Sequence, residues 1–363
     1  MSRRTHYNPA RGSLHWRIMK GIQLDRLEAY FAEHVEGAVP PLQFSLITGG
    51  RSNLTFLVED AQGKKRVLRR PPLGAVLATA HDMSREYRIL SALTDSDVPV
   101  PRTLALCQDE AVNDAPFYVM DYVEGDVLVG PEMTAELVPE ENRHALGMNA
   151  IEILANLHRI EPDDVGLGDL GRREAYLARQ LKRWSTQWEK SKTRDLPEME
   201  EAHAVLESKM PEQLGSVIVH GDFRLGNFLS TGAKGRIEAV LDWELCTLGD
   251  PLADVGYLMN DWNGPGDDRP TASGTGLSST SCGGFPSREA ILERYEELTG
   301  FSTKGVDYYR AFQYWRLAAI VEGVLSRYKQ GVMGDQVDIT QYQTQVTTLA
   351  KAALALVRSN DFS

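Results

Sequence analysis

Three polar side chains in the stretch Val217–Glu244 have the types and spacing that phosphoryl transfer requires. Asp222 follows a short apolar, β-branched run, Asn227 comes five residues later, and Asp242 ends a second apolar run. Short runs of this kind predict buried strands, so each strand would end at a carboxylate, with the amide between them. Phosphoryl transfer uses one carboxylate to orient a hydroxyl and take its proton, and an amide and a second carboxylate to hold magnesium. The stretch therefore predicts a magnesium-dependent phosphoryl-transfer site.

The same residues also allow a structural interpretation. Asp222 and Asn227 could bond their own backbone as turn residues, but their occurrence together with Asp242 favours the catalytic interpretation. His220 is expected to support the loop by packing or by backbone bonds. Arg224 could neutralise a phosphate or be a solvated loop residue, and the sequence leaves both open.

Other polar and aromatic residues are expected to serve the fold. Asp250 and Asp254 would cap the next helix and bond the loop that carries Asp222. His158, at the end of an expected helix, is predicted to cap it. The tryptophans are more typical of a core than of a substrate platform; they are Trp184, Trp188, Trp262 and Trp315.

Length and composition set the class of protein. A chain of 363 residues is long enough for two lobes. The net charge of −12 argues against a nucleic-acid binder and against an anionic-membrane binder. The sequence holds no run of about 18 apolar residues, so no membrane span is expected. Residues 1–20 lack the apolar core of a secretory signal, and a flexible arm is expected there.

The cysteines indicate a reducing compartment. Cys107, Cys246 and Cys282 are odd in number and lack CxxC spacing, so neither a disulfide framework nor a zinc site is expected. Free thiols are typical of a reducing environment, and the cytoplasm is therefore the expected location.

The part of the chain at 21–122 is predicted to be rich in β-structure. Periodicity predicts helices at 22–34 and 81–93 and strands at 44–47, 54–59, 65–69, 104–107 and 117–120. A glycine turn joins the first two strands, and its backbone N–H groups could cover phosphates. Its residues are Gly49, Gly50, Arg51, Ser52 and Asn53. The turn alone is weak evidence, because it matches neither GxGxxG nor the P-loop pattern.

Two charged residues could complete a nucleotide site. Arg69 ends the third strand and could pair with phosphates, although Arg70 is next to it and a solvated edge cation is the alternative. Glu86 lies on the following helix and could pair with Arg69 or with a neighbour on its own helix.

A connector is expected between two parts of the chain. Periodicity is lost in Asp121–Gly125, where backbone groups could bond a flat heterocycle. The parts are a nucleotide-binding one at 21–122 and a catalytic and substrate-binding one at 123–363. In the second part, helices are expected at 142–158, 172–189, 199–209, about 252–261, 287–299, 306–330 and 339–358. The Gly-, Ser- and Thr-rich segment 264–285 is expected to be mobile.

The order of these parts resembles the aminoglycoside phosphotransferase family, small-molecule relatives of the protein kinases. The motif is HGDFRLGN at His220–Asn227, with Asp242-Trp243-Glu244 where protein kinases have Asp-Phe-Gly. The resemblance extends from about Phe44 to Arg358. The stretches VLRRPPLG, HDMSREYRIL, VPVPR, HGDFRLGNF and LDWELCTLGDPLADVGYL look like the subgroup related to kinase domains fused to acyl-CoA dehydrogenases.

The resemblance implies an α+β, bilobal, protein-kinase-like fold, with an antiparallel five-stranded sheet and one key helix in the N-lobe and a mainly helical C-lobe. It implies ATP and Mg²⁺ as cofactors, with Asp222 as the catalytic base and Asn227 and Asp242 as magnesium ligands. Arg69 would replace the phosphate-binding lysine, with Glu86 as its partner. The other nucleotide contacts would be the turn Gly49–Asn53 over the phosphates and Met120, Asp121 and Val123 beside the adenine.

Two departures from the protein-kinase pattern bear on function. Arginine at position 69 presents a planar fork in place of the compact ammonium of lysine. Glu244 replaces the glycine of Asp-Phe-Gly. No activation segment follows, because Asp250 and Pro251 come shortly after Glu244 in the sequence. An enzyme that is always assembled and acts on small molecules is favoured over a protein kinase.

The expected function is transfer of the ATP γ-phosphate to a hydroxyl of a small molecule by a monomer or homodimer. A metabolic hydroxy compound such as a hydroxyacyl-CoA is favoured over an aminoglycoside-type antibiotic. A non-catalytic nucleotide-binding protein is a further alternative. The phosphates of CoA would need a basic patch. One helix offers such a run, although the run is more typical of a solvated face: Arg172, Arg173, Arg179, Lys182 and Arg183.

Overall fold

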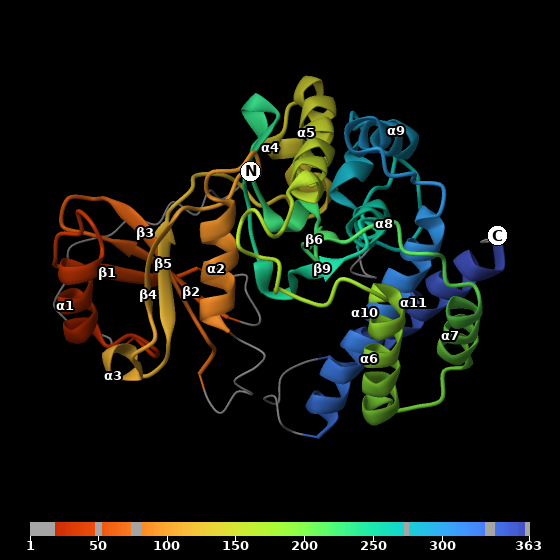
Figure 1. Cartoon of the computed structure of the whole chain (residues 1–363), viewed down its shortest axis with the longest axis horizontal. Helices are drawn as coiled ribbons and strands as arrows, with labels where there is room; N and C mark the ends of the chain where they lie inside the picture. The colour runs from red at the N-terminus through yellow and green to blue at the C-terminus, as the bar shows by residue number, and fades with distance from the viewer. Residues whose placement is uncertain (1–18, 48–52, 74–81, 272–275, 331–337, 360–363) are drawn as a thin grey trace, which may run out of the picture. The chain divides into compact units, whose positions relative to one another are not determined.

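The computed structural model describes residues 19–47, 53–73, 82–271, 276–330 and 338–359 (Figure 1). The chain forms two compact units. The first unit combines Met1–Met83 with Leu104–Val119, and the second combines Ser84–Thr103 with Met120–Ser363. This division differs from the single boundary expected at residues 122 and 123, because Ser84–Thr103 groups with the second unit. Most of the expected N-terminal arm, residues 1–18, lies outside the described residues.

A five-stranded antiparallel sheet forms most of the first unit, with the strand order β1-β2-β3-β5-β4 (Figure 1). The strands are β1 (Gln43–Leu46), β2 (Leu54–Glu59), β3 (Lys65–Arg70), β4 (Thr103–Cys107) and β5 (Phe117–Asp121). β2 and β3 pair along their whole length, with Leu54 opposite Arg70 and Glu59 opposite Lys65. The turn between them is closed by Asp60, whose Oδ1 accepts hydrogen bonds from the backbone N–H groups of Gln62 and Lys64.

Helix α1 (Leu24–His34) supplies the apolar face that covers this sheet. Leu27 and Phe31, four residues apart and so on one face of the helix, are fully buried. They belong to one apolar cluster with Phe56, Leu68 and Val119 of the sheet. The short helix α3 (Glu110–Asn113) lies between β4 and β5 in the chain.

Helix α2 (Met83–Leu93) bonds residues of the second unit through two arginines. Nη2 of Arg88 contacts the carbonyl oxygen of Gly166 and the carboxylate of Asp169. Nη2 of Arg85 donates to the carbonyl oxygens of Leu170, at 2.8 Å, and Cys246, at 2.9 Å. Two charge-assisted bonds to carbonyls distant in the chain anchor the helix more firmly than neutral bonds would. The sequence pattern contains no sign of these contacts, which explains why the division of the chain was not foreseen.

The rest of the second unit is mainly helical, with α10 (Val306–Lys329) at its centre. The other helices are α4 (Gly130–Leu137), α5 (Glu140–Arg159), α6 (Tyr176–Ser191), α7 (Pro197–Ser208), α8 (Leu252–Asn260), α9 (Arg288–Thr299) and α11 (Ile339–Ser359). α10 is buried on all sides over most of its length and packs against α6, α8 and α11 (Figure 1). A helix buried all round can fix several neighbours at once.

Two small antiparallel sheets carry the chemically interesting segments. β6 (Val217–Val219) pairs with β9 (Thr247–Gly249), and β7 (Phe228–Thr231) pairs with β8 (Arg236–Val240). All three residues of β6 are buried. The loop 220–227 joins β6 to β7, and Asp242 follows β8, as the two apolar runs predict.

The α+β, protein-kinase-like fold class and the main elements are as expected, with most ends shifted by one to four residues. α3, α4, β7 and β9 were not foreseen. The segment expected to be mobile contains a packed turn, η4 (Ser279–Cys282), that contacts α4; residues 272–275 lie outside the described part. None of the helices in the described ranges combines the length and apolarity that crossing a membrane requires.

Candidate phosphoryl-transfer site

One buried carboxylate, that of Asp254, bonds the backbone of the loop between β6 and β7. Asp254 of α8 accepts hydrogen bonds from the backbone N–H groups of His220, at 2.7 Å, and Gly221, at 2.8 Å. Nε2 of His158 lies 3.3 Å from the same carboxylate. Burial, the largest influence, raises the pKa of Asp254, but the hydrogen bonds and nearby imidazoles lower it overall. Asp254 therefore bonds the loop as expected.

His158 does not cap its helix, which corrects the expectation from its position. Its Nδ1 is 2.6 Å from the Tyr295 hydroxyl, and its Nε2 faces Asp254. The side chain is fully buried. The helix-end rule considers only local backbone charge, whereas these partners come from α8 and α9, far away in the chain.

His220 ties the loop to the segment that carries Asp242. Its Nδ1 accepts from the backbone N–H of Asp222 at 3.2 Å, so Nε2 carries the proton and donates to the carbonyl of Leu241 at 3.0 Å. The imidazole is fully buried against Trp243, with ring centroids 4.6 Å apart. The structural role expected of His220 is confirmed.

Gly221 has a backbone conformation that other residues avoid. Its φ is +87°, and a Cβ atom at this position would lie 2.9 Å from the carbonyl oxygen of Leu245. Its own carbonyl accepts a hydrogen bond of 2.7 Å from Arg316 of α10. The central helix thus helps to fix the residue directly before Asp222.

Asp222 and Asn227, two residues of the predicted phosphoryl-transfer set, contact each other directly. Nδ2 of Asn227 donates to Oδ2 of Asp222 at 2.7 Å and to its carbonyl oxygen at 2.8 Å. With its amide nitrogen engaged twice, Asn227 keeps Oδ1 as an acceptor, and none of the described residues donates to it. The side chain of Asp222 is 21% exposed, so its carboxylate remains reachable.

Asp242 adds a second carboxylate to the same electrostatic environment. It follows β8 and has a left-handed backbone, with φ 67° and ψ 61°. Trp243 then fixes the turn, because its indole N–H donates to the carbonyl of Val240 at 3.0 Å. The negative charge of Asp242 acts on Arg224, which places the two side chains within electrostatic reach.

Arg224 lies at this site, so the interpretation of a solvated loop residue does not hold. Its Nε is 3.4 Å from Oδ1 of Asp222. Burial is the largest influence on the pKa of Arg224 and lowers it, but the nearby anionic groups, Asp222 first, raise it overall. The guanidinium therefore stays charged and offsets part of the negative charge of the site.

Tyr257 and Arg316 were missed at the sequence level. The negative charge of Asp222 acts on Tyr257: burial, followed by that charge, raises the pKa of the Tyr257 hydroxyl well above its usual value. Tyr257 lies three residues after Asp254, a spacing that puts both on one face of α8. That spacing could have identified Tyr257; no local pattern identifies Arg316.

The predicted nucleotide residues are distributed between the two units. Arg69 is half-buried on β3 of the first unit, opposite Thr55. Arg70 is structural: its Nη1 donates to the carbonyls of Gly21, at 2.6 Å, and Asn113, at 3.0 Å. Asn53 is buried in the first unit. The remaining turn residues lie outside the described part of the chain: Gly49, Gly50, Arg51 and Ser52.

The other nucleotide candidates belong to the second unit. Glu86 is buried on α2, and its pairing with Arg69 stays a prediction. Met120 is buried at the end of β5, and Val123 is half-buried. The carboxylate of Asp121 pairs with Nε of Arg102 at 3.0 Å, so any contact of Asp121 with adenine would come from its backbone.

Two residues of the basic run on and before α6 have partners of their own. Arg173 pairs with Glu161 and Asp163, at 3.3 and 2.8 Å. Arg183 lies over the ring of Trp184, 4.9 Å from its centroid. Trp188, Trp262 and Trp315 are buried, as expected of core residues.

A family model described as "Phosphotransferase enzyme family" (APH) matches residues 43–278. Among curated proteins, the chain is 33% identical to acyl-CoA dehydrogenase family member 10 of Mus musculus, over 92% of this chain and 31% of the relative. It is also 33% identical to acyl-CoA dehydrogenase family member 11 of Gallus gallus, over 92% of this chain and 42% of the relative. The chain therefore spans less than half the length of these relatives.

Solved structures share the fold. One, from Ralstonia eutropha and provisionally described as an aminoglycoside phosphotransferase, has 31% identity and a TM-score of 0.79, covering 93% of this chain and 98% of that chain. A thermostable mutant of aminoglycoside phosphotransferase APH(4)-Ia, in a ternary complex with AMP-PNP and hygromycin B, has 18% identity and a TM-score of 0.57, covering 92% of this chain and 98% of that chain. At that identity, the second similarity shows the fold alone.

Proposed function

Because the chain belongs to the APH phosphotransferase family, we propose that it uses ATP and Mg²⁺ to phosphorylate a hydroxyl group of a small molecule. The observation that carries this proposal is the Asp222–Asn227 pair, held on a loop whose backbone is fixed by Asp254, His220 and Arg316. Phosphoryl transfer depends mainly on positioning and on charge neutralisation. The bonds to the backbone of this loop provide the positioning.

Asp222 is proposed to orient the acceptor hydroxyl and take its proton. Its Oδ2 is fixed by Asn227, and its carboxylate is partly exposed, so a hydroxyl could approach to about 3 Å. Tyr257 of α8 lies within electrostatic reach of the same carboxylate. Arg224 offsets negative charge beside it and would contact a phosphate oxygen.

Asn227 and Asp242 are proposed to hold Mg²⁺. The donor set fits, because Asn227 keeps Oδ1 as an acceptor and oxygen ligands suit this ion. Within the described ranges, no group of three or more His, Cys, Asp or Glu could hold a metal alone. Phosphate and water oxygens would complete the coordination, as is usual for Mg²⁺, and the bound ion would neutralise phosphate charge.

The nucleotide contacts are proposed from the pattern of the family. Arg69, with Glu86 as partner, would hold phosphates, and the turn Gly49–Asn53 would cover them. Backbone groups of Asp121 and Val123, next to Met120, would face the adenine. The APH(4)-Ia complex with AMP-PNP supports a nucleotide in this fold.

The acceptor is proposed to be a hydroxyacyl-CoA-type metabolite. The curated relatives named as acyl-CoA dehydrogenase family members support this class. The alternative is an aminoglycoside-type antibiotic, which the solved neighbours support. A non-catalytic nucleotide-binding protein is the second alternative, favoured only by arginine at position 69.

The test is ADP release by the purified full chain with hydroxyacyl-CoA compounds and with kanamycin-like compounds. We expect turnover with the former that falls by roughly 10²-fold or more in Asp222→Asn. Glu201→Gln, an exposed α7 residue paired with Arg358, is the matched control and should keep wild-type turnover. Activity on kanamycin alone would replace the acceptor class. Binding of Mg-ATP without transfer to any acceptor would favour the non-catalytic alternative.

A further inference from the structure

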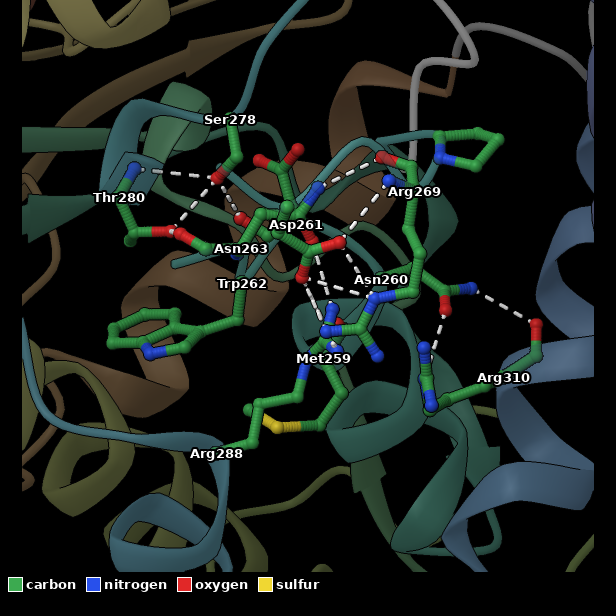
Figure 2. A network of polar contacts seen from close by, with 12 residues as sticks. Met259, Asn260, Asp261, Trp262, Asn263, Arg269, Ser278, Thr280, Arg288 and Arg310 are labelled. Atoms are coloured by element: carbon green, nitrogen blue, oxygen red, sulfur yellow. Dashed lines mark hydrogen bonds and ion pairs between the residues drawn. The ribbon is translucent and has the colours of Figure 1, made fainter. Parts of the chain in front are cut away.

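The second unit contains a cavity of about 580 Å³ between α8, α9, α10 and the segment that follows α8. This volume lies within the usual range for small-molecule sites. None of Asp222, Asn227 and Asp242 lines it. Its wall combines three arginines with an apolar surface, and Figure 2 shows the polar network around Arg269, Arg288 and Arg310.

Two of these arginines have carboxylate partners of their own. Nε of Arg269 donates to both oxygens of Asp267, at 2.8 and 2.9 Å. Nη1 of Arg310 donates to Oδ1 of Asp307 at 2.7 Å. The remaining acidic residue of the wall, Glu289, is exposed and hydrogen-bonds Ser287 at the start of α9. Each carboxylate thus has a partner other than Arg288.

Arg288 is the cation whose hydrogen-bonding capacity is not filled. Its Nε donates to the carbonyl of Met259 at 3.1 Å, and its Nη2 donates to Oδ1 of Asn263 at 2.7 Å (Figure 2). Its Nη1 is buried and makes no hydrogen bond within the described part of the chain; Oδ2 of Asp267 is 3.8 Å away. A buried charged donor without an acceptor is costly, so an acceptor supplied by a ligand would be stabilised there.

The two other arginines of the wall act on Arg288. Burial, followed by the charges of Arg310 and Arg269, lowers the pKa of Arg288 to about 10. The first residues of α9 and α10, two helices of 12 and 24 residues, also line the cavity, and helix N-termini attract negative charge. An oxyanion would supply the acceptor that Nη1 of Arg288 lacks, which a cationic group without a free lone pair could not.

The apolar part of the wall is rigid. Trp262 and Phe285 meet edge to face with ring centroids 5.8 Å apart. The indole N–H of Trp262 donates to the carbonyl of Pro286 at 2.9 Å, which fixes the ring. Leu292 and Val306 add aliphatic surface. This wall would cover a hydrocarbon or aromatic portion of a ligand.

We propose that the cavity binds a small organic oxyanion, a phosphate monoester or a carboxylate. Its charged oxygen accepts a hydrogen bond from Nη1 of Arg288, and its apolar portion packs on Trp262 and Phe285. The proposal does not rest on phosphoryl transfer, because it concerns none of the residues assigned to that reaction.

The test is calorimetric titration of the full chain with inorganic phosphate, phenyl phosphate and benzoate. Excess Mg²⁺ and a non-hydrolysable ATP analogue would be present, so that the nucleotide site is occupied. We expect phenyl phosphate or benzoate to bind, and the tighter of the two identifies the oxyanion. Phenyl phosphate should bind on the order of 10-fold more tightly than inorganic phosphate, because the phenyl ring buries apolar surface.

Two variants and a control separate binding from folding. Arg288→Gln should weaken binding about 10-fold or more. Ser287→Asp keeps a good helix cap, since Ser287 caps α9, and should weaken binding by adding negative charge at the wall. Arg294→Gln, on α9 but paired with Glu152 and Glu297, should bind like the wild type. Absence of binding by all three probes, or equal affinities in Ser287→Asp and the wild type, would overturn the proposal.

Discussion

The loop 220–227 carries one carboxylate, that of Asp222, and is supported by a second, that of Asp254 on α8; the two differ in exposure. Asp254 is fully buried and accepts two backbone N–H bonds and an imidazole contact. Asp222 is partly exposed and accepts a hydrogen bond from Asn227 through one carboxylate oxygen. A carboxylate enclosed by donors can only hold geometry, whereas one with a reachable oxygen can take part in a reaction. The support of the loop and the proposed chemistry are thus assigned to different carboxylates.

The largest expected effect comes from breaking the support. Asp254→Ala would leave the N–H groups of His220 and Gly221 and the imidazole of His158 buried without an acceptor. We expect the free energy of unfolding to fall by about 3 kcal/mol or more, as for a broken buried pair. Urea denaturation measures this, with Glu201→Gln as the surface control. A loss as small as the control's would mean that Asp254 does not organise the loop.

The proposed chemistry should show the opposite pattern. Asp222→Asn keeps the shape of the side chain, so the free energy of unfolding should change by only about 1 kcal/mol, the usual net contribution of one hydrogen bond. Turnover should fall by roughly 10²-fold or more. Steady-state kinetics and a melting curve on the same preparation check both. A large loss of stability would show that Asp222, like Asp254, supports the fold, and would contradict the proposed difference between the two carboxylates.

A backbone variant of the same loop is expected to have an effect of intermediate size. Gly221→Ala introduces a Cβ atom 2.9 Å from the carbonyl of Leu245 at a φ of +87°. We expect a loss of about 1–3 kcal/mol of stability, together with reduced turnover because Asp222 follows directly. Gly300→Ala is the matched control, since it has a φ of +73° with no atom within 4 Å of the added Cβ. Equal effects of both variants would assign the cost to φ alone.

Residue types constrained by chemistry were predictable from the sequence. The spacing of Asp222, Asn227 and Asp242 identified them as one chemical set; in the structure the first two contact each other and the third acts on the same arginine as Asp222. Periodicity and apolar runs located the five strands of the sheet and most long helices, because burial imposes those patterns.

Long-range partners were not predictable in the same way. His158 bonds Tyr295 and Asp254, and Arg85 bonds the carbonyls of Leu170 and Cys246. Such contacts join residues that no local pattern connects, and the helix-end rule applied to His158 considers only its own helix. The arginines of the oxyanion cavity, at positions 269, 288 and 310, are likewise spread over three segments without a shared motif.

The smallest expected effect concerns a carboxylate between these extremes. Asp267 is mostly buried, but its partner Arg269 is half-exposed. Hydrogen bonding to Arg269, the largest influence, lowers the pKa of Asp267 from 3.8 to about 2. Because the folded-state pKa is the lower one, the stabilisation is present above about pH 4 and is lost as the pH falls towards 2. After screening by solvent at Arg269, we expect a contribution of about 1 kcal/mol.

The measurement is urea denaturation of the wild type and of Asp267→Asn between pH 5 and about pH 2, the range over which the two states bind protons differently. The variant should lose less stability on acidification, and Asp268→Asn, at the exposed neighbouring position, should follow the wild type. Identical acid profiles for wild type and Asp267→Asn would show that the pair is screened like a surface ion pair. Asp254 would then differ from Asp267 because buried donors enclose it. The same enclosure distinguishes Asp254 from Asp222.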